Sequence, residues 1–167
     1  MIINFDKRDC QTVTNAKKFG ICDTPSPNLE PAYIDSKNGE NWIATVFNYH
    51  QRVIKFTAID HCAQILSKGI KMKKTCDAMM RFDDHVLFIE LKERSGNNNQ
   101  WINEGIKQLE STIQFFESTD ECQLFTEKKA FIANNKKRRY PEMNTIKIRD
   151  FKLKTGYALR ITPRIVI

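Results

Sequence analysis

Two acidic residues and one lysine form the part of this sequence best suited to chemistry. Twelve residues separate Asp77 from the run Glu90-Leu91-Lys92. The segment between Asp77 and Glu90 reads as two apolar stretches separated by Asp83-Asp84, a pair typical of a tight turn. If these two residues are the centre of a hairpin turn, opposed residues have numbers that sum to 167, and Asp77 lies opposite Glu90.

That register predicts a metal site. Opposed side chains on one face of a sheet lie about 5 Å apart at Cβ, and Lys92 shares the face of Glu90 because strand side chains alternate. Two carboxylates this close repel each other unless a cation lies between them, and oxygen ligands suit Mg²⁺ or Mn²⁺. The alternative is a cross-strand salt-bridge cluster on a half-exposed sheet. The apolar residues 86–89 favour the metal, because they predict burial of Glu90, and a buried carboxylate needs a cation or several donors.

The pattern resembles the active site of the PD-(D/E)XK, or restriction-endonuclease-like, nucleases. The proline that this family has before its Asp is replaced here by Cys76. The segments 57–60, 76–79 and 88–92 are also similar to a group of small uncharacterised bacterial proteins.

The resemblance implies a role for each residue. Asp77 and Glu90 would ligate Mg²⁺ together with the backbone carbonyl of Leu91, and Lys92 would orient the attacking water and offset charge in the transition state. The reaction would be hydrolysis of a phosphodiester bond in DNA, as by an endonuclease. Family members that cut duplex DNA often pair, so the resemblance leaves a homodimer open.

Two other residues are weaker candidates for the site. Some family members place a Gln near the position of Gln108, often with a Tyr four residues on, where this chain has Thr112. Gln108 lies one position off the apolar stripe of its helix, so we expect it to face solvent. Asp60 is either an outlying acid of the site or a cap of its own helix.

The positive charge of the chain is concentrated near its C-terminus. The net charge is +7, but residues 128–167 hold 12 Lys and Arg against 2 acids. This asymmetry indicates either a polyanion partner, DNA by the resemblance, or a solubilising surface. Candidate DNA contacts outside the Asp77–Glu90–Lys92 group are polar or basic residues in predicted loops, which are alternatively plain solvated turns: Asn98, Lys136, Lys137, Arg138 and Arg139.

The elements that position these residues follow from apolar periodicity. Ile102, Ile106, Leu109, Ile113 and Phe116 predict a helix over 101–117. Thr57 and Asp60 resemble a capping box, so a second helix is expected over 58–67, ending near Gly69. Strands are predicted over 42–47 and 52–57, paired as a hairpin, and over 129–134, 145–153 and 157–167. Residues 1–40 read as an irregular N-terminal arm, with a short helix near 9–18 as the exception.

These elements predict an α/β (α+β) fold: a mixed central sheet flanked by helices, in one domain over 41–167. Their order matches the αβββαβ core of the nuclease family, with the 42–57 hairpin as an addition. The helix over 101–117 should bring the 129–134 strand in parallel beside the Glu90 strand.

Composition limits the alternatives. No apolar run approaches the roughly 20 residues of a membrane helix, and no secretory signal is visible. The five cysteines have no C-x-x-C spacing, so neither a disulfide framework nor a zinc site is expected, and the cytoplasm is the expected location. Two other functions remain open: a catalytically inactive nucleic-acid-binding protein and a protein-interaction module.

Overall fold

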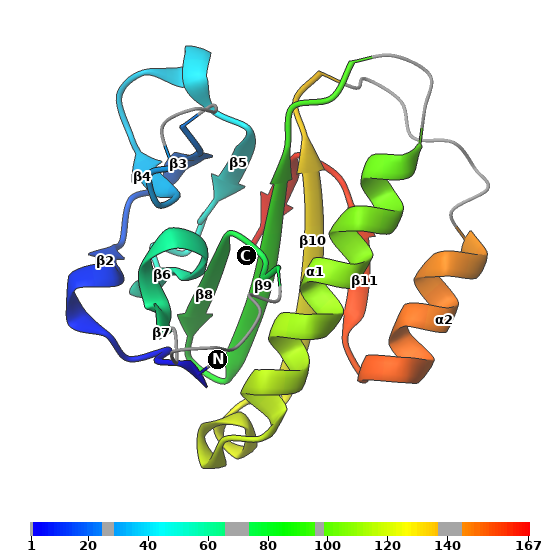
Figure 1. The fold of residues 1–167 in the computed structure, drawn as a ribbon. Helices are drawn as coiled ribbons and strands as arrows, with labels where there is room; N and C mark the ends of the chain where they lie inside the picture. The colour runs from blue at the N-terminus through cyan, green and yellow to red at the C-terminus, as the bar shows by residue number, and fades with distance from the viewer. Residues whose placement is uncertain (1, 25–28, 66–73, 96–98, 137–144) are drawn as a thin grey trace.

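The structure is a computed structural model that describes residues 2–24, 29–65, 74–95, 99–136 and 145–167. It has three layers (Figure 1). A six-stranded sheet forms the middle layer, two helices cover one of its faces, and a four-stranded sheet covers the other.

The six-stranded sheet is mixed. Its strands, in spatial order, are β11 (Ala158–Ile161), β10 (Glu127–Asn134), β9 (His85–Lys92), β8 (Ala78–Phe82), β6 (Ile54–Ala58) and β2 (Gln11–Thr14). The four strands from β9 to β2 pair antiparallel, whereas β10 is parallel to both β9 and β11. The chain therefore makes a meander, β6–β8–β9, and returns through a helix to add β10 beside β9.

The second sheet is smaller and also mixed. It contains β12 (Arg164–Val166), β5 (Ala44–Phe47), β3 (Lys18–Cys22) and β4 (Tyr33–Asp35) in that order. β12 is parallel to β5, and the other pairs are antiparallel. A separate short pair joins β1 (Ile2–Ile3) to β7 (Gln64–Ile65).

The helices are α1 (Gln100–Glu117) and α2 (Thr145–Thr155), with short 3-10 turns at η1 (Arg8–Cys10), η2 (Gly39–Asn41) and η4 (Asp120–Leu124). α1 buries the predicted stripe, including Ile102, Leu109, Ile113 and Phe116, against the sheet. In the described part of the chain, no helix is long and apolar enough to cross a lipid bilayer.

Alternation along β9 divides the core in two. Val86 and Phe88 pack beneath the helices, and Leu87 and Ile89 pack against the four-stranded sheet. Because side chains alternate along a strand, Glu90 is on the helix-covered face. The two layers of apolar side chains explain why this strand reads as almost continuously apolar.

Several predictions are confirmed. β8 and β9 pair in the expected register, from Ala78 opposite Ile89 to Phe82 opposite His85. Asp83, in the turn, has φ of 47°, a left-handed conformation that aspartate tolerates in turns. The α1 helix and the parallel pairing of β10 with β9 are also as predicted, as are strands within 157–167.

The predicted 42–57 hairpin is wrong, although both of its strands exist. β5 belongs to the four-stranded sheet and β6 to the six-stranded sheet. Val46 and Ile54 instead bury in the same apolar layer between the sheets. An alternating pattern shows that a strand has an apolar face. It does not show whether the next strand pairs with it in the same sheet or packs against that face from a second sheet.

The helix predicted over 58–67, which was to begin the αβββαβ core, does not form. The chain makes an irregular turn, η3 (Ile59–Ala63), in which Asp60 is extended (φ −64°, ψ 139°) and His61 has φ of 58°. The Thr57 hydroxyl donates to the Phe5 carbonyl, at 3.5 Å, instead of capping a helix. Gly69, the expected end of this helix, lies outside the described residues.

Two further segments differ from prediction. Residues 145–155 form α2 and not a strand, and only Phe151 of this helix is buried. Ile146 is 62% exposed and Leu153 is 79% exposed, so the apolar residues of this segment do not form the buried face of a strand. The region 1–40 is not an irregular arm: its strands join both sheets, and the expected helix near 9–18 is a 3-10 turn followed by β2.

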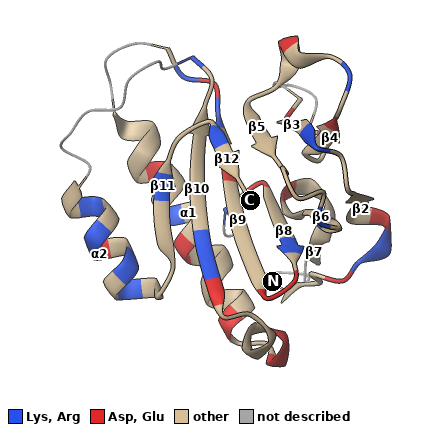
Figure 2. Ribbon diagram, turned by 180° about the vertical axis from the view of Figure 1, so that it is seen from behind, with Lys and Arg blue, Asp and Glu red and all other residues tan. Residues whose placement is uncertain are grey.

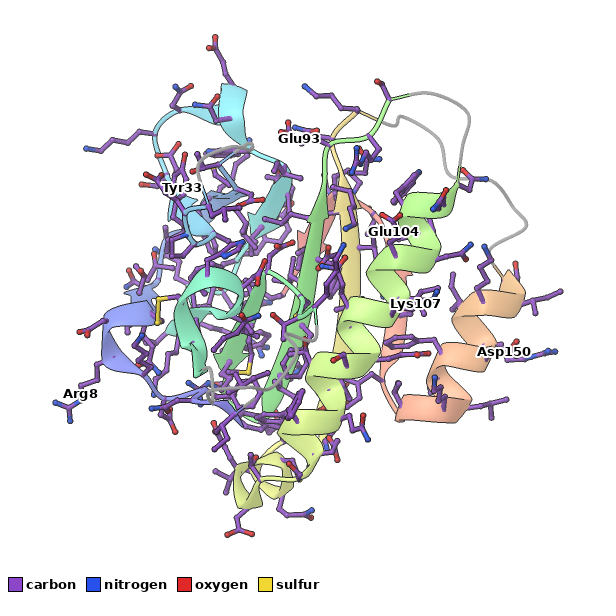
Figure 3. All side chains as sticks on the ribbon, in the orientation of Figure 1. Arg8, Tyr33, Glu93, Glu104, Lys107 and Asp150 are labelled. Atoms are coloured by element: carbon purple, nitrogen blue, oxygen red, sulfur yellow. A yellow bond between two sulfur atoms is a disulfide. The ribbon has the colours of Figure 1, made fainter. Side chains whose placement is uncertain are left out.

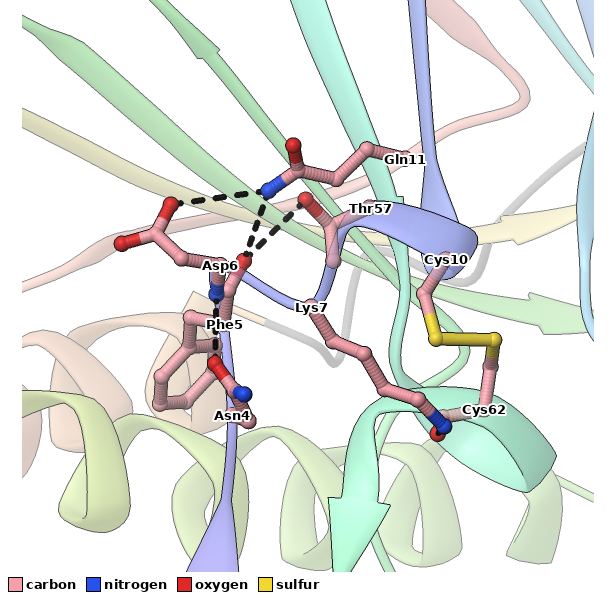
Figure 4. The surroundings of a disulfide bond; sticks show 8 residues. All are labelled: Asn4, Phe5, Asp6, Lys7, Cys10, Gln11, Thr57 and Cys62. Atoms are coloured by element: carbon pink, nitrogen blue, oxygen red, sulfur yellow. Dashed lines mark hydrogen bonds between the residues drawn. A yellow bond between two sulfur atoms is a disulfide. The ribbon is translucent and has the colours of Figure 1, made fainter.

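A disulfide joins Cys10 to Cys62, with the two Cα atoms 5.7 Å apart (Figure 4). One disulfide therefore forms where the cysteine spacing indicated no disulfide framework, and the cysteines no longer argue for a reducing compartment. The two residues are 52 positions apart in sequence, and folding of the N-terminal segment onto η3 brings them together. Lys7 Nζ donates to the Cys62 carbonyl at 2.9 Å, which also links the N-terminal segment to η3.

Candidate active site

Asp77 stands immediately before β8, on the face of the six-stranded sheet that α1 covers. Met79, two residues on, packs in the core beneath the helices, and alternation places Asp77 on the same face. The Leu91 backbone N–H donates to Asp77 Oδ2 at 2.6 Å. This bond ties the carboxylate to the strand that carries Glu90 and Lys92.

Glu90 is the most deeply buried acid of the group, at 1% exposure. The helix lies close above it because α1 has a glycine there: a Cβ on Gly105 would come within 3.4 Å of Glu90 Cγ and 3.0 Å of Ile132 Cδ1. Glu90 Oε1 pairs with Lys92 Nζ at 2.6 Å. Glu90 Oε2 is buried and has no hydrogen-bond partner in the described part of the chain.

Lys92 is held by α1 as well as by Glu90. Gln108 Oε1 accepts from Lys92 Nζ at 2.9 Å, and Gln108 Nε2 donates to the Thr75 carbonyl at 3.0 Å. The expectation that Gln108 faces solvent is therefore wrong. Helical periodicity placed it beside the apolar stripe, but not against a lysine from the neighbouring strand.

Thr112, one turn after Gln108, also connects α1 to the segment before Asp77. Its hydroxyl accepts from the Cys76 backbone N–H at 2.8 Å and donates to the Gln108 carbonyl at 2.9 Å. The helix is thus fixed to residues 75–76, directly before Asp77. The Cys76 thiol is fully buried, and burial raises its pKa well above the usual range, so it stays protonated.

Asp60 lies near these residues in η3, without capping a helix. Its Oδ1 accepts from Gln64 Nε2 at 2.9 Å, and its Oδ2 is 3.1 Å from His61 Nε2. Asp60, His61 and Asp77 line a pocket of about 190 Å³ with Asp23 from the end of β3. Sequence reasoning missed Asp23, because it lies in the segment taken as irregular and no motif marks it.

Electrostatics in the group are dominated by burial. Burial raises the pKa of Asp77 to about 7. The hydrogen bond from the Leu91 N–H lowers this pKa, and the nearby Asp23 carboxylate raises it by a smaller amount. Burial and then the charge of Asp77 raise the pKa of Glu90 well above its usual range, although Lys92 lowers it. The two carboxyl groups therefore resist being ionised together, as close acids in a low-dielectric site do.

The chemistry of these residues suits a hard divalent cation. An ion between Asp77 and Glu90 would offset their repulsion and give Glu90 Oε2 the partner it lacks. Among the residues that the structure describes, no group of three His, Cys, Asp or Glu side chains is arranged to hold a metal. An ion here would therefore need backbone or water oxygens as well, and the Leu91 carbonyl remains the predicted one.

Of the other predicted contacts, Lys136 alone lies among the described residues, and it is not brought to this group. Asn98, Lys137, Arg138 and Arg139 lie outside the described residues. Lys136 is exposed, and its Nζ is 3.7 Å from Glu93 Oε1. Glu93 follows directly after β9 (Figure 3), so Lys136 lies beyond the end of the strand that carries the site.

Comparison with known proteins identifies no relative. No protein-family model matches the chain, and neither a curated protein nor a solved structure matches it significantly.

Proposed function

We propose that this protein is a Mg²⁺- or Mn²⁺-dependent nuclease that hydrolyses phosphodiester bonds in DNA, as its resemblance to the PD-(D/E)XK nucleases implies. The observation that carries the proposal is the unpartnered Glu90 Oε2, buried on the same face of the sheet as Asp77. A buried acceptor without a partner costs about 1–3 kcal/mol, and more when it is charged. Such a cost is typical of functional sites.

A purely structural salt bridge explains the arrangement less well. Lys92 pairs with Oε1 of Glu90 only, and Asp77 has a backbone N–H as its partner. One ammonium thus faces two buried carboxyl groups, so the group has an excess of negative charge when both are ionised. Buried charges that serve stability are expected to balance, whereas an excess of acid suits a cation-binding site.

The topology supports the same proposal. The meander β6–β8–β9, followed by α1 and the parallel strand β10, follows the βββαβ part of the core that the resemblance implies. In that scheme the Asp and the Glu-x-Lys run belong to two adjacent antiparallel strands beneath the helix. Asp77 directly precedes β8, and Glu90 and Lys92 lie on β9, which is consistent with these positions, while the leading helix of the scheme does not form over 58–67.

Each residue of the group would have a distinct role in the reaction. A bound divalent ion supplies Lewis-acid polarisation of the phosphate and a water of lowered pKa. Asp77 and Glu90 would hold it, with the Leu91 N–H fixing the Asp77 carboxylate. Lys92, oriented by Gln108, would present its ammonium to the negative charge that develops on the scissile phosphate.

The test is a cleavage assay on supercoiled, linear and single-stranded DNA and on RNA, with Mg²⁺ and with Mn²⁺. We expect Glu90→Gln and Lys92→Met each to lower the rate by about 10²-fold or more. Glu93→Gln, an exposed acid just past β9, is the matched control and should cleave as the wild type does. Wild-type protein that cleaves none of these substrates, or a Glu90→Gln variant as active as the control, would refute the proposal.

A nucleic-acid-binding protein without hydrolytic activity is the second candidate. It is favoured by α2, which carries four Lys or Arg and one acid: Lys147, Arg149, Lys152, Lys154 and Asp150. Salt-dependent DNA binding that persists in Lys92→Met, together with wild-type protein that does not cleave, would select this function. Co-purification with a protein, without affinity for DNA, would instead point to an interaction module.

A further inference from the structure

The outer face of the four-stranded sheet combines aromatic rings with cations, on the side of the molecule away from α1. Inward residues such as Phe19, Val46 and Ile165 bury against the six-stranded sheet. Alternation then turns Lys18, Phe47 and Arg164 outward, and Lys18 is paired with Phe47 across β3 and β5. The face is therefore not an apolar layer that another element of this fold covers.

Phe47, Tyr49 and Arg164 form the first part of this surface. The Phe47 and Tyr49 rings are stacked with centroids 5.8 Å apart and an angle of 28°. The Arg164 guanidinium lies 4.1 Å from the centroid of Phe47, and its Nη2 donates to the Tyr49 hydroxyl at 3.3 Å. Tyr49 remains 50% exposed, so the stack is open to a further flat group.

Trp42 and Lys18 extend the surface. The Trp42 indole lies directly on Gly20, where an added Cβ would come within 1.9 Å of Trp42 Cγ, and Trp42 Nε1 donates to Asp35 Oδ2 at 3.0 Å. Lys18 Nζ lies 5.8 Å from the Trp42 centroid and 5.5 Å from the Phe47 centroid. Lys18 thus lies near both the Trp42 and the Phe47 rings, and Arg164 lies over Phe47 and bonds to Tyr49.

A groove continues from this surface over the edge strands. It has a volume of about 850 Å³, and its lining includes Lys129, Arg160 and Arg164 and no acid, although Lys129 Nζ lies 3.9 Å from Glu127 Oε2. Figure 2 shows this side of β10, β11 and β12, with positions of Lys and Arg on the strands. Within the part of the chain that the structure describes, no carboxylate forms an ion pair with Lys18, Arg160 or Arg164.

We infer that this surface, defined by Trp42, Lys18, Phe47, Tyr49 and Arg164 with the adjoining groove, binds single-stranded nucleic acid. Cations without carboxylate partners fit a polyanion, and exposed rings fit a partner that itself presents flat bases. A single strand offers both together, because its phosphates alternate with unstacked bases. In a duplex the bases are already stacked on each other, so duplex DNA would use the cations alone.

This inference goes beyond the proposed hydrolysis and does not depend on it. The surface lies on the four-stranded sheet, whereas Asp77, Glu90 and Lys92 face α1 on the opposite face of the six-stranded sheet. Binding can be measured in EDTA, where no divalent ion is present for cleavage, and in Glu90→Gln. Failure of the cleavage assay therefore leaves this test unaffected, and failure of this test leaves the cleavage assay unaffected.

The experiment is fluorescence anisotropy with labelled 12-mers of deoxythymidine, of uridine and of duplex DNA, in EDTA. We expect both single strands to bind more tightly than the duplex, and the preference between the first two identifies DNA or RNA as the ligand. Tyr49→Ala should weaken single-strand binding roughly tenfold. Arg164→Gln should reduce the slope of log K against log salt by about 0.7. Arg8→Gln on η1 makes the same charge change at an exposed position away from the surface and should alter single-strand binding least.

Tryptophan fluorescence provides a second measurement on the unmodified chain. Trp42 is half-buried, whereas Trp101 is 3% exposed, so bound bases should quench Trp42 fluorescence, and Trp42→Phe should abolish the quenching. Three results would each overturn the inference: no binding of either single strand at low salt, equal affinity for duplex and single strands, or equal weakening by Arg8→Gln and Arg164→Gln.

Discussion

Replacing Asp77 by Asn should stabilise the metal-free protein at alkaline pH. Burial raises the pKa of Asp77 from 3.8 to about 7. A carboxyl group whose pKa is higher in the folded chain holds its proton more tightly there. Its contribution to the free energy of unfolding is therefore complete below about pH 4 and is lost as the pH rises through about 7.

The size of the effect follows from that shift. Each pKa unit is worth about 1.4 kcal/mol, so ionised Asp77 costs the folded protein up to about 4 kcal/mol at pH 8. An Asn side chain retains an oxygen that can accept the Leu91 N–H. We expect the free energy of unfolding of Asp77→Asn at pH 8 to exceed that of the wild type by about 2–4 kcal/mol. In a chain of this length that corresponds to an increase in Tm of roughly 5–15 °C.

Urea unfolding in EDTA at half-unit steps from pH 4 to pH 8.5 measures this difference. The wild type should lose stability relative to Asp77→Asn as the pH rises, and the two should converge near pH 4. Mg²⁺ or Mn²⁺ at one hundred times its Kd should then stabilise the wild type by about 2.7 kcal/mol, with little effect on the variant. Glu93→Gln controls for the loss of a negative charge at an exposed position.

Two results would contradict this reasoning. If the difference between wild type and Asp77→Asn is constant from pH 4 to pH 8.5, the Asp77 carboxyl does not titrate as its burial requires. If both proteins gain the same stability from the metal, the ion binds elsewhere.

Two structural contacts allow further predictions. Arg81 is 7% exposed and pairs with Glu121, and we expect Arg81→Met to lower the free energy of unfolding by about 3 kcal/mol, because an acid loses its buried partner. Urea unfolding measures this, Arg149→Met on α2 should change it by less than about 0.5 kcal/mol, and equal values would contradict it. Cys10→Ser should cost the oxidised protein about 2–4 kcal/mol, because the disulfide restricts the unfolded chain. Dithiothreitol should bring the wild type to the variant's stability and leave the variant unchanged, and a wild type insensitive to reduction would exclude the bridge in solution.

The sequence alone determined the hairpin that brings the acids together. Two residues typical of a turn, between two apolar runs, predict one register that places both acids on one face, and the β8–β9 pairing has that register. The α1 helix was predictable for a related reason, since its apolar stripe repeats over four turns. In both cases the signal is local, and the strength of a local signal does not depend on the rest of the fold.

Only the tertiary structure decided how these local elements combine. β5 and β6 lie in different sheets because both bury their apolar faces in the layer between the sheets, an arrangement that alternation does not distinguish from a hairpin. η3 replaces the helix predicted from Thr57 and Asp60, because Thr57 instead bonds to the N-terminal segment.

The contacts of the candidate site were also beyond the sequence. Gln108 bonds to Lys92 and Asp23 lines the pocket beside Asp77, although both are far from the motif along the chain. Residue type and spacing specify which groups share one strand or one helix. Which of those groups meet across layers depends on how the layers pack. The packing energy of the layers depends on burial and shape summed over the whole core, and not on any one segment.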